Sequence, residues 1–293
     1  MRKIAILFLI CVAFAAACRT GDVRPSSGET RAVTDSLGRT VRLPMRIERA
    51  VSLAPSMTEM IFAAGAGDRL VGVTTYCNYP AETASIEKVG DTQSPNLEKI
   101  LALRPQVVFV STASQLEAYM ETLDEQGIVV YVENSSSLDQ VLQGIQLLGS
   151  FFDTRDTADR VSSSLNARLA KVRRERVRPS PRVFVQISNE PLFTIGKDSF
   201  LSPVIQDAGG YCVTSHIPSA YPKISKETAA AENPDVIILS DSDDNREPNP
   251  AFKDSRAVKT GRVYRVNADI ISRPGPRLVD ALEEIAAKLA ESH

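Results

Sequence analysis

The 293-residue chain has no tryptophan, and its two histidines are His216 and the last residue, His293. A transition-metal site normally needs several His, Cys or carboxylate ligands close together, and neither H-E-x-x-H nor C-x-x-C occurs. Direct capture of zinc or manganese is therefore not expected. The chain also lacks a nucleophile elbow with a base, and a glycine-rich phosphate loop. Nothing in the sequence predicts catalysis, so we expect a binding protein.

An excess of charge of either sign is also missing. The chain has 34 Lys and Arg against 36 Asp and Glu, a formal net charge of −2. Because no basic stripe is present, nucleic acid is not an expected partner. Apolar residues make up 43% of the chain, as in soluble globular proteins, and its length suits two domains.

The N-terminus has the pattern of a secretion signal. Arg2 and Lys3 precede an apolar run, residues 4–17, that is short for a membrane span. Three alanines then lead into Cys18, as at a bacterial lipoprotein cleavage site. We therefore expect residues 1–17 to be a signal peptide and Cys18 to carry a lipid, with residues 18–30 as a tether to a membrane that faces the periplasm or the exterior. The alternative is an ordinary signal with a chance cysteine.

One segment of the chain occurs twice. Shifted by 129 residues, Glu98 falls on Glu227, Pro105 on Pro234 and Ser111 on Ser240. Each copy predicts a polar N-cap, a short helix, a proline break and an apolar strand. The repeat indicates two lobes of similar build, each with one carboxylate at a helix N-terminus and a cleft between them.

The rest of the chain alternates short apolar strands with helices, which indicates an α/β fold of two doubly wound lobes with parallel sheets. A hairpin is expected over residues 32–43. The expected strands are 50–53, 70–75, 128–132, 182–187 and 262–266, and the expected helices are 58–64, 115–126, 138–151, 200–208 and 277–291.

A single long helix is expected to join the two lobes. Residues 153–178 contain no glycine or proline and carry an apolar stripe at helical spacing. We therefore place an N-terminal lobe at 31–152, the linking helix at 153–179 and a C-terminal lobe at 180–293. A stiff helix of this kind limits hinge motion. Cys77 and Cys212 would then lie in opposite lobes, where a disulfide would lock the cleft, so we expect both to be unpaired.

Several short motifs, in this order, resemble the substrate-binding proteins of ABC importers for metal chelates, namely cobalamin, haem and ferric siderophores. They are residues 51–59 (VSLAPSMTE), 71–73 (VGV), 76–80 (YCNYP), 96–98 (NLE), 193–197 (FTIGK) and 273–277 (RPGPR). The resemblance covers about residues 31–291. It implies two α/β lobes joined by one long helix, a ligand cleft between them, a monomer, and an ABC permease and ATPase as partners.

The resemblance also assigns roles to individual residues. Glu98 and Glu227 match the glutamates that meet arginines on the permease. A glutamate in the first turn of a helix is, however, common in itself because it suits the helix dipole. Tyr76 and Tyr221 match aromatic residues of the cobalamin pocket, and a tyrosine packed under a loop is the alternative for each.

Further ligand contacts follow from the same resemblance. Asp269 and Arg273 match an acidic and a basic residue that bond ligand amides, or they form a local ion pair. Thr92 and Ser111 stand where cobalamin binders carry tryptophans. His216 lies in a loop that the resemblance places at the cleft, where with Tyr76 it could ligate haem iron, or it is a solvated loop histidine.

The expected ligand is a corrinoid, with haem second and a ferric siderophore third. An anionic siderophore would require several arginines in the cleft, and only Arg273 is placed there. Two hypotheses of other classes remain. One is a receptor that reports ligand occupancy to a sensor, and the other is an enzyme that processes a chelate in the cleft.

Overall fold

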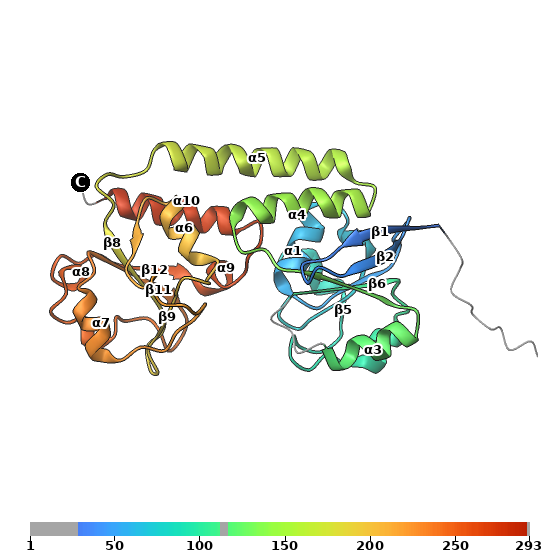
Figure 1. The fold of residues 1–293 in the computed structure, drawn as a ribbon, viewed down its shortest axis with the longest axis horizontal. Helices are drawn as coiled ribbons and strands as arrows, with labels where there is room; N and C mark the ends of the chain where they lie inside the picture. Colours follow the sequence, from blue (N-terminus) through green and yellow to red (C-terminus); the bar gives the residue numbers. More distant parts are fainter. Residues whose placement is uncertain (1–28, 112–116, 292–293) are drawn as a thin grey trace, which may run out of the picture.

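A computed structural model describes residues 29–111 and 117–291 of the chain (Figure 1). The expected signal peptide, Cys18 and most of the tether lie outside the described residues. Within the described ranges, no helix combines the length and the apolar character that a membrane crossing requires.

The first lobe is built on a five-stranded parallel sheet with the order β5-β4-β3-β6-β7. A hairpin of β1 and β2 precedes it, as expected. The strands are β1 (Thr30–Thr34), β2 (Thr40–Pro44), β3 (Ala50–Ser52), β4 (Leu70–Val73), β5 (Glu87–Lys88), β6 (Val107–Ser111) and β7 (Val129–Glu133). The helices are α1 (Pro55–Ala63), α2 (Leu97–Ala102), α3 (Glu117–Glu125) and α4 (Leu138–Phe151), with short 3-10 turns at Gly67–Arg69 and Ala81–Ser85.

The second lobe repeats this design. Its parallel strands have the order β10-β8-β11-β12, which matches β4-β3-β6-β7, and a short β9 pairs antiparallel with β8. The strands are β8 (Arg182–Ser188), β9 (Phe193–Thr194), β10 (Tyr211–Cys212), β11 (Val236–Asp241) and β12 (Val263–Asn267). The helices are α6 (Leu201–Asp207), α7 (Lys226–Glu232), α8 (Arg256–Lys259), α9 (Ala268–Ile271) and α10 (Leu278–Ala290), with a 3-10 turn at Pro250–Phe252.

The repeated segment folds the same way in both lobes. The side chains of Asn96 and Ser225 cap α2 and α7 by accepting hydrogen bonds from the third backbone N–H of each helix. Arg104 and Asn233 then adopt positive φ angles of 47° and 38°, each directly before a proline. A left-handed residue closes the helix, and the proline prevents it from continuing. The expectation of two similar lobes is confirmed by these matched details.

Each sheet is covered on both faces, and one helix serves both lobes. The 20-residue helix α5 (Arg155–Arg174) packs Ala158 into the core of the first lobe and Leu169 and Val172 into the core of the second. In Figure 1, α5 runs along one side of the molecule above α4 and α10. The opposite sheet faces carry α2 and α3 in the first lobe, and α7 and α8 in the second. The α/β architecture with a long linking helix is therefore confirmed.

Helix ends account for two local corrections. The linking helix spans Arg155–Arg174 rather than residues 153–179, and the segment after it is held by the bond of Arg176 to Asp207 of α6 and by packing of Val177 against the second core. The helix expected at 58–64 begins at Pro55, whose fixed φ suits a first helical position. Cys77 and Cys212 are free and buried in separate cores, as expected.

A cavity between the lobes as the candidate functional site

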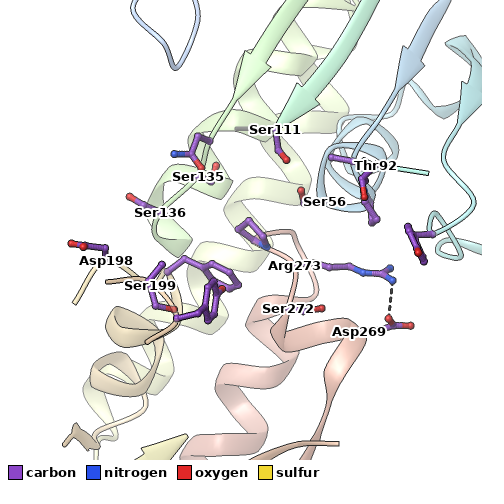
Figure 2. Close-up of a pocket in the computed structure, with 18 of the residues that line it drawn as sticks. Ser56, Thr92, Ser111, Ser135, Ser136, Asp198, Ser199, Asp269, Ser272 and Arg273 are labelled. Carbon is purple, nitrogen blue, oxygen red and sulfur yellow. Dashed lines mark hydrogen bonds and ion pairs between the residues drawn. The ribbon is translucent and has the colours of Figure 1, made fainter. Parts of the chain in front are cut away.

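A cavity of about 720 Å³ is lined by residues of both lobes (Figure 2). Its first-lobe residues lie at the ends of β3, β4, β5, β6 and β7 or within a few residues after them, and its segment 269–274 follows β12. Ligands of open α/β sheets bind outside the carboxyl ends of the strands, so the fold itself predicts a site at this place. The lining residues are Ala54, Pro55, Ser56, Tyr76, Thr92, Gln93, Ser111, Asn134, Ser135, Ser136, Asp198, Ser199, Phe200, Ala220, Tyr221, Asp269, Ser272, Arg273 and Pro274.

Six of the seven residues expected to contact the ligand line this cavity. They are Tyr76, Thr92, Ser111, Tyr221, Asp269 and Arg273. The two tyrosines come from opposite lobes, and their side chains are 56% and 41% exposed. Large aromatic side chains left open to solvent within a cavity are typical of a binding surface.

His216 is not among the residues that line this cavity. The residue is exposed and does not belong to the cavity wall. Its Nδ1 lies 3.1 Å from the carbonyl oxygen of Val213, a contact within its own loop. The loop reaches the cavity only at its end, through Ala220 and Tyr221. A role for His216 in ligand binding therefore remains a prediction.

Small hydroxyl and amide side chains make up much of the wall, and the sequence reasoning missed most of them. In Figure 2, Ser135, Ser136, Asp198 and Ser199 lie toward one side of the view, and Thr92 and Asp269 lie toward the other. Their place after strand ends was the available signal, but serine is also common in ordinary loops. The missed polar residues are Ser56, Gln93, Asn134, Ser135, Ser136, Asp198, Ser199 and Ser272.

Positive charge in the wall is confined to one side chain that already has partners. Among the described lining residues the only base is Arg273, and its Nη2 donates to Oδ1 of Asp269 at 2.8 Å. Its Nη1 donates to Oδ1 of Asn78 at 2.7 Å. Asp269 and Arg273 thus form a local ion pair, which was one of the two alternatives considered from the sequence. Both residues also line the cavity. The wall therefore offers many neutral hydrogen-bonding groups, one arginine paired with Asp269, and the carboxylate of Asp198.

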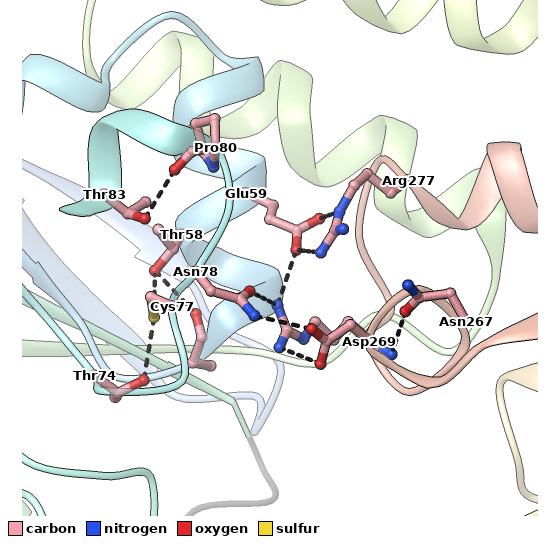
Figure 3. Close-up of polar contacts among 12 residues, drawn as sticks. Thr58, Glu59, Thr74, Cys77, Asn78, Pro80, Thr83, Asn267, Asp269 and Arg277 are labelled. Atoms are coloured by element: carbon pink, nitrogen blue, oxygen red, sulfur yellow. Dashed lines mark hydrogen bonds and ion pairs between the residues drawn. The ribbon is translucent and has the colours of Figure 1, made fainter. Parts of the chain in front are cut away.

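A buried charge network adjoins this pair and joins the two lobes (Figure 3). Glu59 of α1 is 3% exposed and accepts from Nη2 and Nε of Arg277, at 2.6 and 3.0 Å. The hydrogen bonds to Glu59 raise the pKa of Arg277, which keeps its guanidinium charged. That guanidinium also lies 4.2 Å from the centre of the Tyr79 ring. The sequence reasoning assigned Glu59 and Arg277 no role beyond the family motifs.

Burial changes the acidity of two groups at the cavity. Desolvation raises the pKa of Tyr221, against a weaker opposing effect of its hydrogen bond with Ser199. Desolvation also raises the pKa of Glu133, which ends β7 just behind the lining residues 134–136, and the hydroxyl of Ser135 bonds its carboxylate at 3.1 Å. Within the described part of the chain, no three His, Cys, Asp or Glu side chains are grouped to hold a metal ion.

The two glutamates of the repeat are both exposed. They lie in the first turns of α2 and α7, which cover the sheet faces directed away from α5. In Figure 1, α7 lies on the far side of its lobe from α5. Glu227 bonds its own backbone N–H and the hydroxyl of Ser225, and these bonds lower its pKa. Neither carboxylate has an ion-pair partner within the described residues.

Residues 51–270 match the family model described as periplasmic binding protein. The chain belongs to this family. It is 30% identical to the vitamin B12-binding protein of Vibrio cholerae over 84% of this chain and 90% of that protein. An uncharacterized ABC transporter substrate-binding lipoprotein of Bacillus subtilis is 28% identical over 97% of this chain and 95% of its own.

The fold agrees with that assignment. The crystal structure of the Vibrio cholerae vitamin B12-binding protein superposes with a TM-score of 0.74 at 28% identity, and the match covers 85% of this chain and all of that one. The chain is therefore a substrate-binding protein of the ABC-importer class, as the motifs of its sequence indicated.

Proposed function

We propose that the protein is a lipid-anchored binding protein that captures a corrinoid, with cobalamin as the first candidate, and delivers it to an ABC permease. The observation that carries this proposal is the chemistry of the cavity wall. Serine hydroxyls and side-chain amides surround the space, and a tyrosine stands on each lobe. A corrinoid is a flat macrocycle with neutral amides around its edge. Its faces would pack on the rings, and its amides would exchange hydrogen bonds with the wall.

Charge argues against the other two candidates. Haem carries two carboxylates and many ferric siderophores are anionic, and burying such a charge without a cation beside it is costly. The single arginine of the described wall already has Asp269 and Asn78 as partners. The expected haem ligand His216 is also outside the cavity.

A titration of the purified protein with cyanocobalamin, dicyanocobinamide and haemin tests the ligand. Saturable corrinoid binding is expected, and Tyr76→Ser should weaken it. Tyr211→Ser is the matched control, because Tyr211 is a similarly exposed tyrosine outside the cavity wall. Tight binding of haemin with a Soret shift that Tyr76→Phe abolishes would instead identify haem as the ligand.

Docking through Glu98 and Glu227 is the second part of the proposal. Two unpaired carboxylates on equivalent helices can each bond an arginine of the permease and fix the orientation of the complex. The double variant Glu98→Arg with Glu227→Arg should bind ligand normally but fail in import. Glu175→Arg with Glu284→Arg makes the same charge change at exposed positions of the α5 and α10 layer. Import that survives the first pair would refute docking and favour a receptor for a sensor.

The lipid anchor is tested separately. Cys18→Ser should shift the protein from the membrane fraction to the soluble fraction of the cell envelope. A protein that stays in the membrane fraction after this substitution would show that another feature holds it there.

A further inference from the structure

A carboxylate that does not reach the cavity lies at the meeting point of the two lobes. Glu59 belongs to α1 of the first lobe and is not part of the cavity wall. Its partners Arg273 and Arg277 come from the second lobe, more than 200 positions later in the chain. Oε1 of Glu59 is 2.6 Å from Nη2 of Arg277 and 3.5 Å from Nη1 of Arg273. One buried carboxylate therefore anchors two arginines across the interface.

The same network continues into the cavity wall. Arg273 lines the cavity, and its guanidinium touches Glu59, Asn78 and Asp269 at once. Asn78 of the first lobe also donates to Oδ2 of Asp269 at 2.8 Å, so Asp269 is held from two sides (Figure 3). The side chain of Arg273 is only 11% exposed, whereas that of Asp269 is 48% exposed. The guanidinium of Arg273 is thus held in place by its three partners, and the carboxylate of Asp269 is the more accessible of the two groups at the cavity.

The backbone between the two arginines fits closely against α1. A Cβ atom at Gly275 would lie 3.3 Å from Oε2 of Glu59 and 3.7 Å from Cα of Ser56, which itself lines the cavity. Tyr79 covers the other side of Arg277. Segment 273–277 therefore has little freedom to shift relative to α1 while the ion pairs hold.

We propose that Glu59 is a positioning residue for ligand binding, which acts through Arg277 and Arg273 to hold Asp269 and Arg273 in a fixed arrangement at the cavity wall. This inference rests on the proposed function, because it assumes that the cavity binds the ligand. The physical reason is preorganisation: polar groups that are already held in place need not be ordered when the ligand binds. The two arginines, Glu59 and Asp269 also balance to zero charge, so this network adds no net charge beside a ligand with neutral amide groups.

Binding of cyanocobalamin to four forms of the full-length protein tests the inference. These are the wild type, Glu59→Gln, Asp269→Asn and the double variant. Glu59→Gln keeps the size of the side chain but removes its charge, and we expect it to weaken binding about tenfold. The double variant should weaken binding by less than the product of the two single effects. The reason is that Glu59 acts on binding through Arg273, which holds Asp269 in place. Effects that multiply, or a Glu59→Gln protein with wild-type affinity, would overturn the inference.

Glu283→Gln is the matched control. It also removes one carboxylate from an arginine pair, with Arg168 on the α5 and α10 layer, and it should leave the affinity unchanged. The melting temperature of each variant is measured alongside, so that loss of folded protein is not read as loss of affinity. An equal loss of affinity in the control would contradict a role specific to Glu59.

Hydrogen–deuterium exchange separates failure of this inference from failure of the proposed function. If the wild type binds no corrinoid, the proposed ligand is wrong, but the positioning role is still testable without ligand. Glu59→Gln should then speed exchange in residues 76–80 and 269–277 and leave β11 unchanged. Unchanged exchange in both segments would overturn the positioning role.

Discussion

Replacement of Arg277 by methionine should cost more stability than any substitution in the exposed charge pairs of this protein. Methionine keeps much of the aliphatic volume but removes both hydrogen bonds to Glu59 and the contact with the Tyr79 ring. Glu59 would retain only Arg273, at 3.5 Å, as an ionic partner. Since its side chain is 2% exposed, water cannot replace the lost donors.

The size of the effect follows from that burial. Removing one partner of a buried ion pair costs about 3–5 kcal/mol, because it leaves an uncompensated charge in the interior. Typical domains are stable by only about 5–15 kcal/mol, so this is a large fraction. A chain of this size loses about 2–4 °C in melting temperature per kcal/mol, which predicts a fall on the order of 10 °C.

Urea denaturation followed by circular dichroism measures the loss of unfolding free energy, and two further variants serve as controls. Arg168→Met removes an arginine whose side chain is 37% exposed, together with its bonds to Asp280 and Glu283, and should cost less than about 1 kcal/mol. Glu59→Gln combined with Arg277→Met should be more stable than Arg277→Met alone, because the unpaired charge is gone. A double variant no more stable than Arg277→Met would refute this reasoning.

Three other predictions concern single features. Burial raises the pKa of Glu133 in the folded protein. The contribution of this group to stability is therefore present at low pH and is lost as the pH rises through that pKa. In urea denaturation, Glu133→Gln should be more stable than wild type at pH 8 but not at pH 4. Gly196→Ala would place a Cβ 2.2 Å from the carbonyl oxygen of Ser219, so it should lower the free energy of unfolding by about 1–3 kcal/mol. Because the substitution moves the loop that ends at Tyr221, it should also weaken ligand binding in a titration. Cys77 and Cys212 are buried thiols. In a protein that begins after Cys18, Ellman's reagent should therefore titrate two thiols only after unfolding. A protein in which no thiol reacts even after unfolding would instead contain a disulfide.

Short-range rules made much of the fold predictable. The N-caps Asn96 and Ser225, the proline breaks and the apolar strands depend on residues within a few positions of one another, so the pattern is visible in the sequence. Helix α4 has the predicted ends, residues 138 and 151, because a serine caps its start and its apolar stripe is continuous. The end of α5 was mispredicted because residues 175–178 contain no glycine or proline, whereas the structure holds this segment by a contact with another helix, Arg176 to Asp207.

The site was predictable where the resemblance matched single positions. Tyr76 and Arg273 stand in the quoted motifs, Tyr221 and Asp269 match family positions outside them, and all four line the cavity. His216 was placed by its loop alone, and the direction of a loop side chain depends on contacts that a sequence does not display.

By itself, the sequence determined the two-lobe plan, the family, and the two exposed glutamates on matched helices, since these follow from local periodicity, capping and repetition. The tertiary structure alone decided which polar groups share the cavity and that Glu59 pairs with Arg277. A glutamate within a helix resembles a surface residue until the fold brings a partner from the other lobe to within 2.6 Å. Such a pair depends on how two separately folded lobes meet, and no local pattern encodes that distance.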